Sequence, residues 1–360
     1  MIRSVWVKGY RNLSETVLPL PTGQPLVIWG DNNQGKTNLL DAIYFAANGQ
    51  TTLKAADHEL VQLGQEKAQV GLLFSNSHDE NHRLYVQVTP EGEKRIVLDQ
   101  RIVRRRGDAF SAVMVDYWSA DLIRLFQDAP EQRRREVDRF VGHIQHGYSQ
   151  LLQDYERTLR HKVEVLKGNT FSGLELWNKK LVSLSVQIVE ARRKALALLE
   201  SELKKWLPQI RPSLNGQIQI RYTAKHVGVE DYEINLVQAL AHHSEAEKSR
   251  KQALVGPHRD DFDIVMDNKP LFTMGSRGIN RTVAIAFEWV QFFLRTQQKP
   301  RPTLLLLDDI CAEIDATGKR QLLSFFESQV PLVYASTASD RAYFSNAVME
   351  RQMREGRLVE

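Results

Sequence analysis

The residues with the clearest chemical purpose form the segment Gly30–Thr37, which fits the pattern G-x-x-x-x-G-K-[ST]. The apolar run Leu26–Trp29 precedes it and the apolar-periodic segment Leu39–Tyr44 follows it, as expected for a strand, a loop and a helix. In such a P-loop, backbone N–H groups at the helix start surround phosphate oxygens. Lys36 would reach the β- and γ-phosphates and the Thr37 hydroxyl would ligate Mg²⁺. The segment therefore predicts a site for a nucleoside triphosphate.

An acidic pair follows the apolar run Leu304–Leu307, which predicts a buried strand. At the end of such a strand, Asp308 could hold Mg²⁺ together with Thr37, and Asp309 could orient or deprotonate an attacking water. Two aspartates in this position can also serve only as a turn or a helix cap. The P-loop elsewhere in the chain favours the nucleotide site.

Three further segments have the order and spacing of an ABC-type ATPase. A serine and a glycine before a predicted helix at Thr282 can be a simple cap, but they also resemble the signature that completes the ATP site of the opposite subunit. The expected trans-signature residues are Ser276, Arg277 and Gly278. The expected D-loop residues are Glu313 and Asp315. The third segment contains Ser336, near the end of the next predicted strand, which could sense the γ-phosphate. The expected catalytic residues are therefore Lys36, Asp308, Asp309 and Ser336. The expected ATP-binding residues are Gly30, Asp31, Asn32, Asn33, Gln34, Gly35, Lys36, Thr37 and Asn38.

Composition limits the class of protein. The chain has 360 residues, of which 42% are hydrophobic and 26% charged, so a large core in two lobes is possible. No apolar run approaches the roughly 20 residues of a membrane span, and the start of the chain lacks a secretory signal. The single cysteine, Cys311, excludes an internal disulfide. These features predict a cytoplasmic protein with no membrane partner.

The net charge is only +4, but arginines cluster in two places. Such clusters can be ordinary solvated faces or pair with local acids; in a nucleotide-binding chain they also indicate a phosphate-rich partner. The candidate DNA-binding residues are Arg104, Arg105, Arg106, Arg133, Arg134 and Arg135. We expect contacts mainly with the phosphate backbone, since no base-reading module is recognisable.

The pattern of elements predicts an α/β fold. Residues 1–125 alternate like antiparallel strands around the P-loop, and Leu176–Leu207 has apolar residues at helical spacing, ended by Pro208 and Pro212. Alternating strands and helices return near the end of the chain. We therefore expect a discontinuous ATPase head, residues 1–125 and 255–360, with a mostly helical lobe, residues 126–254, that is too short for a long coiled coil.

The chain resembles the RecF family of bacterial recombination mediators, which are SMC/Rad50-like ABC ATPases. The similarity covers nearly the whole length. Besides the segments above, it rests on Tyr10–Asn12, on Pro130–Arg135 leading to Asp138, and on Gly256–Asp261. Transport ATPases lack the last two segments.

The resemblance implies an ATP- and Mg²⁺-dependent homodimer that clamps DNA at gapped duplexes and single-strand/double-strand junctions. It also implies partnership with RecR and, through it, RecO to load RecA in gap repair and replication restart, and a nucleoid-associated location. An aspartate at position 309, where many ABC ATPases have glutamate, implies a weak, DNA-stimulated ATPase.

Three segments depart from the family pattern: Asn33 replaces a usual glycine, Met274–Ile279 lacks the glutamine of the signature, and Tyr117–Asp121 lacks the usual Pro-Glu-Asp. Two alternatives remain open, the first of which is motivated by the altered signature. One is a structural DNA-binding dimer that binds ATP with negligible turnover, and the other is the ATPase subunit of a transporter.

Overall fold

The structure of the protein, a computed structural model, describes residues 1–76, 78–103, 109–127, 129–168, 170–214, 216–329, 331–337, 340–344 and 348–359. The chain divides into two compact units, unit 1 with residues Met1–Leu122 and Thr296–Glu360 and unit 2 with residues Ile123–Arg295. Residues 255–295, which we assigned to the ATPase head, lie within the compact unit of the helical lobe. The predicted assignment of residues 255–295 to the ATPase head therefore stays a prediction.

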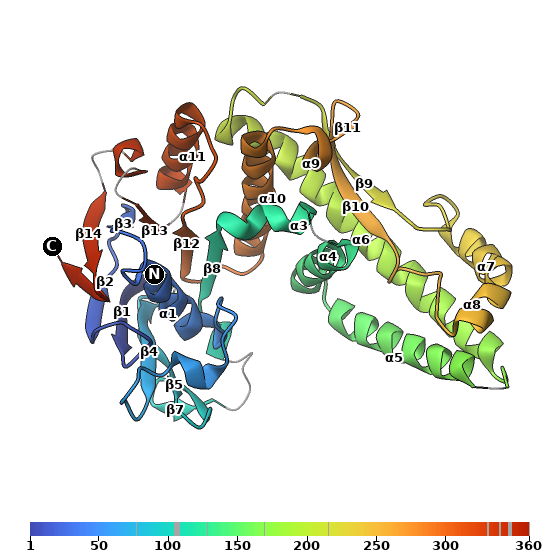
Figure 1. The fold of residues 1–360 in the computed structure, drawn as a ribbon, viewed down its shortest axis with the longest axis horizontal. Helices are drawn as coiled ribbons and strands as arrows, with labels where there is room; N and C mark the ends of the chain where they lie inside the picture. Colours follow the sequence, from blue (N-terminus) through green and yellow to red (C-terminus); the bar gives the residue numbers. More distant parts are fainter. Residues whose placement is uncertain are drawn as a thin grey trace. The chain divides into compact units, whose positions relative to one another are not determined.

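Unit 1 contains two six-stranded sheets with helix α1 (Lys36–Asn48) between them (Figure 1). The first sheet is antiparallel in the order β2-β1-β4-β5-β6-β7, with bounds β1 Ile2–Lys8, β2 Thr16–Pro19, β4 Ala68–Ser75, β5 Asn81–Val88, β6 Lys94–Leu98 and β7 Arg101–Ile102. The second has the order β15-β14-β3-β13-β12-β8, with bounds β3 Leu26–Trp29, β8 Met114–Ser119, β12 Thr303–Asp308, β13 Leu332–Ser336, β14 Met349–Arg354 and β15 Arg357–Val359. All neighbours in the second sheet are parallel except the edge pair β14–β15.

The core of unit 1 explains why α1 is apolar on nearly every side. Leu40 and Ile43 of α1 are fully buried in one cluster with Val70 and Leu72 of the antiparallel sheet and with side chains of the parallel sheet. A helix covered on two opposite faces has no wide solvent-facing stripe. Helix α11 (Ala316–Gln329) also packs on the parallel sheet, where Phe326 meets Trp118 of β8 edge to face.

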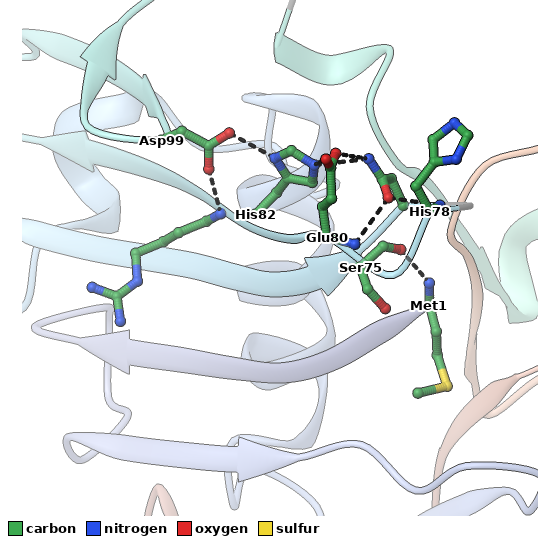
Figure 2. A network of polar contacts seen from close by, with 8 residues as sticks. Met1, Ser75, His78, Glu80, His82 and Asp99 are labelled. Atoms are coloured by element: carbon green, nitrogen blue, oxygen red, sulfur yellow. Dashed lines mark hydrogen bonds and ion pairs between the residues drawn. The ribbon is translucent and has the colours of Figure 1, made fainter.

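Polar contacts tie together the turns at one end of the antiparallel sheet (Figure 2). His82 Nδ1 lies 2.7 Å from Asp99 Oδ2, and the Asp99 carboxylate also accepts the Arg83 backbone N–H. The Met1 nitrogen donates to the Ser75 carbonyl at 2.5 Å. These contacts join the start of β1 to the end of β4, and the start of β5 to the turn after β6.

Unit 2 is mostly helical, as predicted, and carries the small antiparallel sheet β11-β10-β9. Its elements are α3 Arg124–Gln127, α4 Pro130–Ile144, α5 Tyr148–Lys167, α6 Leu174–Ile210, β9 Ile218–Thr223, α7 Tyr232–His242, α8 Ser244–Arg250, β10 Asp261–Met266, β11 Lys269–Pro270, α9 Leu271–Met274 and most of α10 Arg277–Gln298. Short 3₁₀ turns lie at Asp57–Leu60, Ala120–Ile123 and Asp340–Tyr343. Helices α5 and α6 pack against each other, and the described residues contain no long coiled coil.

Two helix boundaries were predicted wrongly. Helix α6 continues through Pro208 to Ile210, so this proline lies within the last turn and does not end the helix where we expected. Helix α10 begins at Arg277 rather than at Thr282, because its first turn is polar and carries no apolar periodicity. Within the described part of the chain, no helix has both the length and the apolar character needed to cross a lipid bilayer.

Candidate nucleotide site

A cavity of about 1180 Å³ lies at the carboxyl ends of the parallel strands of unit 1. Parallel strands end at one edge of their sheet, and the register aligns Asp308 with Ala335 and Ala335 with Ile28. Residues far apart in sequence are therefore brought together. The predicted site residues in the cavity wall are Asn32, Asn33, Gly35, Lys36, Thr37, Asn38, Asp308, Asp309 and Ser336. They are joined there by Arg11, Asn12, Thr52, Leu53, Glu59, Val61, Gln62, Leu63, Tyr117, Ser119, Ala120, Asp121 and Thr337.

The P-loop has the backbone that phosphate binding requires. Helix α1 begins at Lys36, and Gly35 before it has φ +106°, a conformation that other residues rarely adopt. A Cβ atom on Gly30 would lie 2.5 Å from the Met353 carbonyl oxygen, so no side chain fits there. Lys36 Nζ donates to the carbonyls of Gly30 and Asp31, both at 2.7 Å. Burial lowers the pKa of Lys36, and the charges of Asp308, Asp309 and Asp31 act in the opposite direction.

Asn33, which stands where the family usually has glycine, is exposed. Its φ is +63°, in the left-handed region where glycine is free of strain and asparagine is better tolerated than most residues. The replacement of glycine by asparagine is therefore compatible with the path of the loop.

The turn between β14 and β15 forms two hydrogen bonds with the P-loop, and these were not predicted from the sequence. The Glu355 N–H donates to Gln34 Oε1 at 2.6 Å, and the Gly356 N–H donates to the Gln34 carbonyl at 2.8 Å. Gly356 has φ +76°, and a Cβ there would lie 1.9 Å from the Asn12 carbonyl oxygen. A Glu-Gly turn at the end of the chain is a visible signal, but its partner is more than 300 positions away.

The first acid of the Asp308-Asp309 pair is held firmly. Asp308 is 9% exposed, and Tyr117 of β8 donates its hydroxyl to Asp308 Oδ2 at 2.8 Å. Burial raises the pKa of Asp308, against the opposing effects of hydrogen bonds from Tyr117 and Thr37 and of the Lys36 charge. Thr37 and Asp308 thus present a hydroxyl and a carboxylate side by side, which are the oxygen ligands that Mg²⁺ prefers.

The second acid faces the cavity beside another charged group. Asp309 is exposed, and its pKa is raised by partial desolvation and then by the negative charges of Asp340 and Asp308. The buried Asp340 accepts hydrogen bonds from Lys319 Nζ at 2.7 Å, Ser336 Oγ at 2.9 Å and the Tyr334 hydroxyl at 3.1 Å. Ser336 was predicted from the sequence, but Asp340 and Lys319 were not. Asp340 accepts the Ser336 hydroxyl and so orients it, and Lys319 holds Asp340 in place.

The predicted D-loop residues lie between β12 and α11. Glu313 is exposed with φ +63°, and Asp315 accepts the backbone N–H of Gly318 at 3.3 Å, close to the start of α11. Asp315 therefore contributes a helix cap in this structure. Its role in a dimer stays a prediction.

The predicted trans-signature residues lie in unit 2, at the start of α10. Ser276 Oγ accepts the backbone N–H of Ile279 at 3.4 Å, and both Ser276 and Arg277 are exposed. The cap that we considered for this serine is thus present. An exposed serine at the start of a 22-residue helix is also compatible with a role toward another subunit.

The candidate DNA-binding arginines differ in their surroundings. Arg104–Arg106 lie outside the described residues. Arg133 forms a two-pronged pair with Asp261, Nε to Oδ1 at 2.8 Å and Nη2 to Oδ2 at 2.7 Å, and Arg134 donates to the Asp260 carbonyl at 2.7 Å. Arg135 is exposed. Arg135 also pairs with Glu131 of the same helix, so the alternative of pairing with local acids holds for both Arg133 and Arg135.

The two segments that separate the family from transport ATPases contact each other within unit 2. Besides the Arg133–Asp261 pair, Arg192 of α6 donates to both oxygens of Asp138 at 2.8 Å and to the Pro257 carbonyl at 2.7 Å. Segments more than 100 positions apart are thus joined by one partly buried ion pair and bridged by the buried Arg192.

Comparison with known proteins gives a consistent result. No protein-family model matches the chain. It is 27% identical over 343 residues to the DNA replication and repair protein RecF of Geotalea uraniireducens, covering 94% of this chain and 93% of the relative. It is 29% identical over 335 residues to RecF of Geobacter sp. strain M21, covering 92% and 91%.

The fold agrees with this relationship. A structure of the recombination mediator protein RecF–ATPrS in the RecFOR pathway superposes with a TM-score of 0.80 at 23% identity, covering 99% of this chain and 97% of that one. An Smc head bound to the C-terminal winged-helix domain of ScpA superposes with a TM-score of 0.62 at 16% identity. The fold is that of an ABC-type, Rad50/SMC-like ATPase head, and the chain is similar in sequence to RecF proteins over more than nine-tenths of its length.

Proposed function

We propose that this chain binds ATP with Mg²⁺ in the cavity of unit 1 and acts as an ATP-dependent DNA-binding clamp in recombinational gap repair. The observation that carries the proposal is the convergence of Lys36 and Thr37 with Asp308 and Asp309 on one cavity wall. These groups come from segments more than 250 positions apart and supply a cation for the phosphates and carboxylates for Mg²⁺.

Each side chain has a definite task in the proposed reaction. The start of α1 and Lys36 would bind the phosphates. Thr37 and Asp308 would hold Mg²⁺, which neutralises charge that develops on the phosphoryl oxygens. Asp309 would orient the attacking water and accept its proton, and a raised pKa favours proton uptake by this group. Ser336, held by Asp340, would contact the γ-phosphate.

The exposure of Ser276 and Arg277 supports a proposed role in an ATP-dependent dimer. Ser276, Arg277 and Gly278 would complete the ATP site of a second copy, so ATP would join two copies around DNA. We infer that hydrolysis is slow, because the aspartate at position 309 is shorter than the glutamate of many ABC ATPases. Slow hydrolysis suits a clamp that releases DNA after a delay.

The DNA substrate and partners are proposed from the family. The RecF relatives are named for DNA replication and repair, and the RecF structures are described within the RecFOR pathway. We propose that this chain binds gapped duplex and single-strand/double-strand junctions and acts with RecR and RecO to load RecA. Such action would place it at the nucleoid. Similarity to RecF proteins over more than nine-tenths of the chain argues against the transporter alternative.

The proposal is tested by titrating the protein with ATP in the presence of MgCl₂. Lys36→Ala should weaken ATP binding at least about tenfold, since a hydrogen bond to a charged group contributes ~1.5–3 kcal/mol. Lys67→Ala, an exposed lysine of the same unit, is the matched control and should bind as the unmodified chain does. Equal affinity in the Lys36 variant would refute the site, and binding without measurable turnover would favour the structural-dimer alternative.

A further inference from the structure

Tyr117 is a side chain of the cavity to which the ATPase pattern assigns no task. It lies in β8, next to β12, and the parallel register pairs Tyr117 with Leu306 and Ser119 with Asp308. Side chains two positions apart share a face of a sheet, so Tyr117 and Asp308 lie on the same face as diagonal neighbours. The tyrosine spans this diagonal and donates its hydroxyl to Asp308 Oδ2 at 2.8 Å.

The tyrosine is itself held from the opposite side. Its half-buried ring meets the edge of Tyr44 of α1, with 6.2 Å between ring centroids, and its hydroxyl also interacts with the Thr52 side chain. Thr52 is fixed by the fully buried Asp41, which accepts both its backbone N–H at 2.6 Å and its hydroxyl at 2.7 Å. A continuous set of polar contacts thus runs from α1 to the acid at the end of β12.

This arrangement restricts the Asp308 carboxylate. A hydrogen bond to Oδ2 from an anchored phenol fixes the carboxylate plane, and therefore the direction in which Oδ1 faces. Mg²⁺ demands near-ideal octahedral geometry, so a ligand held in one orientation costs less to bind than a freely rotating one. Hydrogen-bond partners of metal ligands typically change affinity by about 10–100-fold when removed.

We propose that Tyr117 is a positioning residue that orients the Asp308 carboxylate for Mg²⁺ in the nucleotide site. The inference rests on the proposed ATP-binding function and adds to it a residue outside the P-loop and the Asp-Asp pair. Tyr117 acts through Asp308 and has no contact with the phosphates in this account.

The test compares the full-length chain with Tyr117→Phe in ATP titrations, first with EDTA and then at increasing MgCl₂. In EDTA the two proteins should bind ATP equally. The MgCl₂ concentration that gives half of the Mg²⁺-dependent change should rise about tenfold in Tyr117→Phe. Tyr85→Phe removes the same hydroxyl from a tyrosine of β5 outside the cavity, where it packs on Trp6, and should leave both titrations unchanged.

A double-mutant cycle separates positioning from general damage to the fold. If Tyr117 acts through Asp308, Tyr117→Phe should have no further effect on the Mg²⁺ dependence of an Asp308→Ala chain. An unchanged Mg²⁺ dependence in Tyr117→Phe would overturn the inference. So would an equal loss of affinity in EDTA, or an effect that persists in the Asp308→Ala chain. Failure of the unmodified chain to bind ATP under any condition would refute the proposed function itself.

Discussion

The ion pair between Arg192 and Asp138 is a buried interaction of unit 2 whose removal should strongly destabilise the fold. Its side chains are 4% and 12% exposed, and Arg192 Nε and Nη2 each lie 2.8 Å from a carboxylate oxygen. The Tyr148 hydroxyl also donates to Asp138. Burial opposes the charge on Arg192, but the hydrogen bonds and the charge of Asp138 outweigh it and raise the Arg192 pKa above its ordinary value. Both side chains are therefore charged and buried, and each compensates the charge of the other.

Asp138→Asn keeps the shape of the side chain but removes its charge, which leaves Arg192 as an uncompensated buried cation. Breaking a buried pair in this way costs about 3–5 kcal/mol. That is a large fraction of the ~5–15 kcal/mol by which a domain is stable. The matched control is Lys194→Met on the same helix. Lys194 pairs with Glu190 at 2.6 Å, but the side chains are 74% and 60% exposed, so its loss should have little effect on stability.

Urea unfolding followed by far-UV circular dichroism measures this difference, because unit 2 contributes most of the helix signal. Asp138→Asn should lower the unfolding midpoint of the helical signal by about 1–5 M, given an m-value of ~1–3 kcal/mol/M, while Lys194→Met should barely move it. Stabilities of the two variants within about 1 kcal/mol of each other would contradict the assignment of a strong buried pair.

Three further predictions concern ATP hydrolysis, dimerisation and the stability of unit 2. Asp309→Asn should slow ATP hydrolysis at least about 100-fold and trap an ATP-bound dimer, measured by phosphate release and light scattering; unchanged turnover would show that another group positions the water. Ser276→Ala should weaken ATP-dependent dimerisation in sedimentation experiments but leave the ATP affinity of the dilute monomer unchanged; a loss of monomer affinity would contradict a role in trans. Burial lowers the pKa of His258 from 6.5 to about 4, so the stability that depends on its neutral form is complete above pH 6.5 and falls as the pH drops toward 4. Burial raises the pKa of Asp260 to about 6, so protonation of Asp260 below that pH stabilises the fold and opposes the effect of His258. The unmodified chain is therefore compared with His258→Gln, whose free energy of unfolding should fall less over this pH range.

Local patterns were sufficient to predict the elements around the site. The strands that end at Trp29 and Asp308 were visible as short apolar runs, and the P-loop was visible as a spacing of residue types. Both signals are local, and the rule that parallel strands end at one edge brings them together. The same logic placed Ser336 at the end of β13.

What escaped prediction depends on tertiary contacts. Tyr117 matters because the register of β8 against β12 places it diagonally opposite Asp308, and no pattern along the chain specifies that register. Asp340 and Lys319 meet because α11 and the turn after β13 pack together. The arginines of Pro130–Arg135 carried a charge signal that fits DNA and internal pairing equally well, and only the position of Asp261 assigns Arg133 to an internal pair.

The most direct test of the ATP-gated clamp is fluorescence anisotropy on a gapped duplex, with ATP, with ADP and without nucleotide, for the unmodified chain and Lys36→Ala. Our account predicts that only ATP tightens binding, that Lys36→Ala fails to respond, and that affinity falls steeply with salt, by ~0.9 log unit per phosphate contact for each tenfold rise in salt. DNA binding that is equal with ATP, with ADP and without nucleotide would contradict the account.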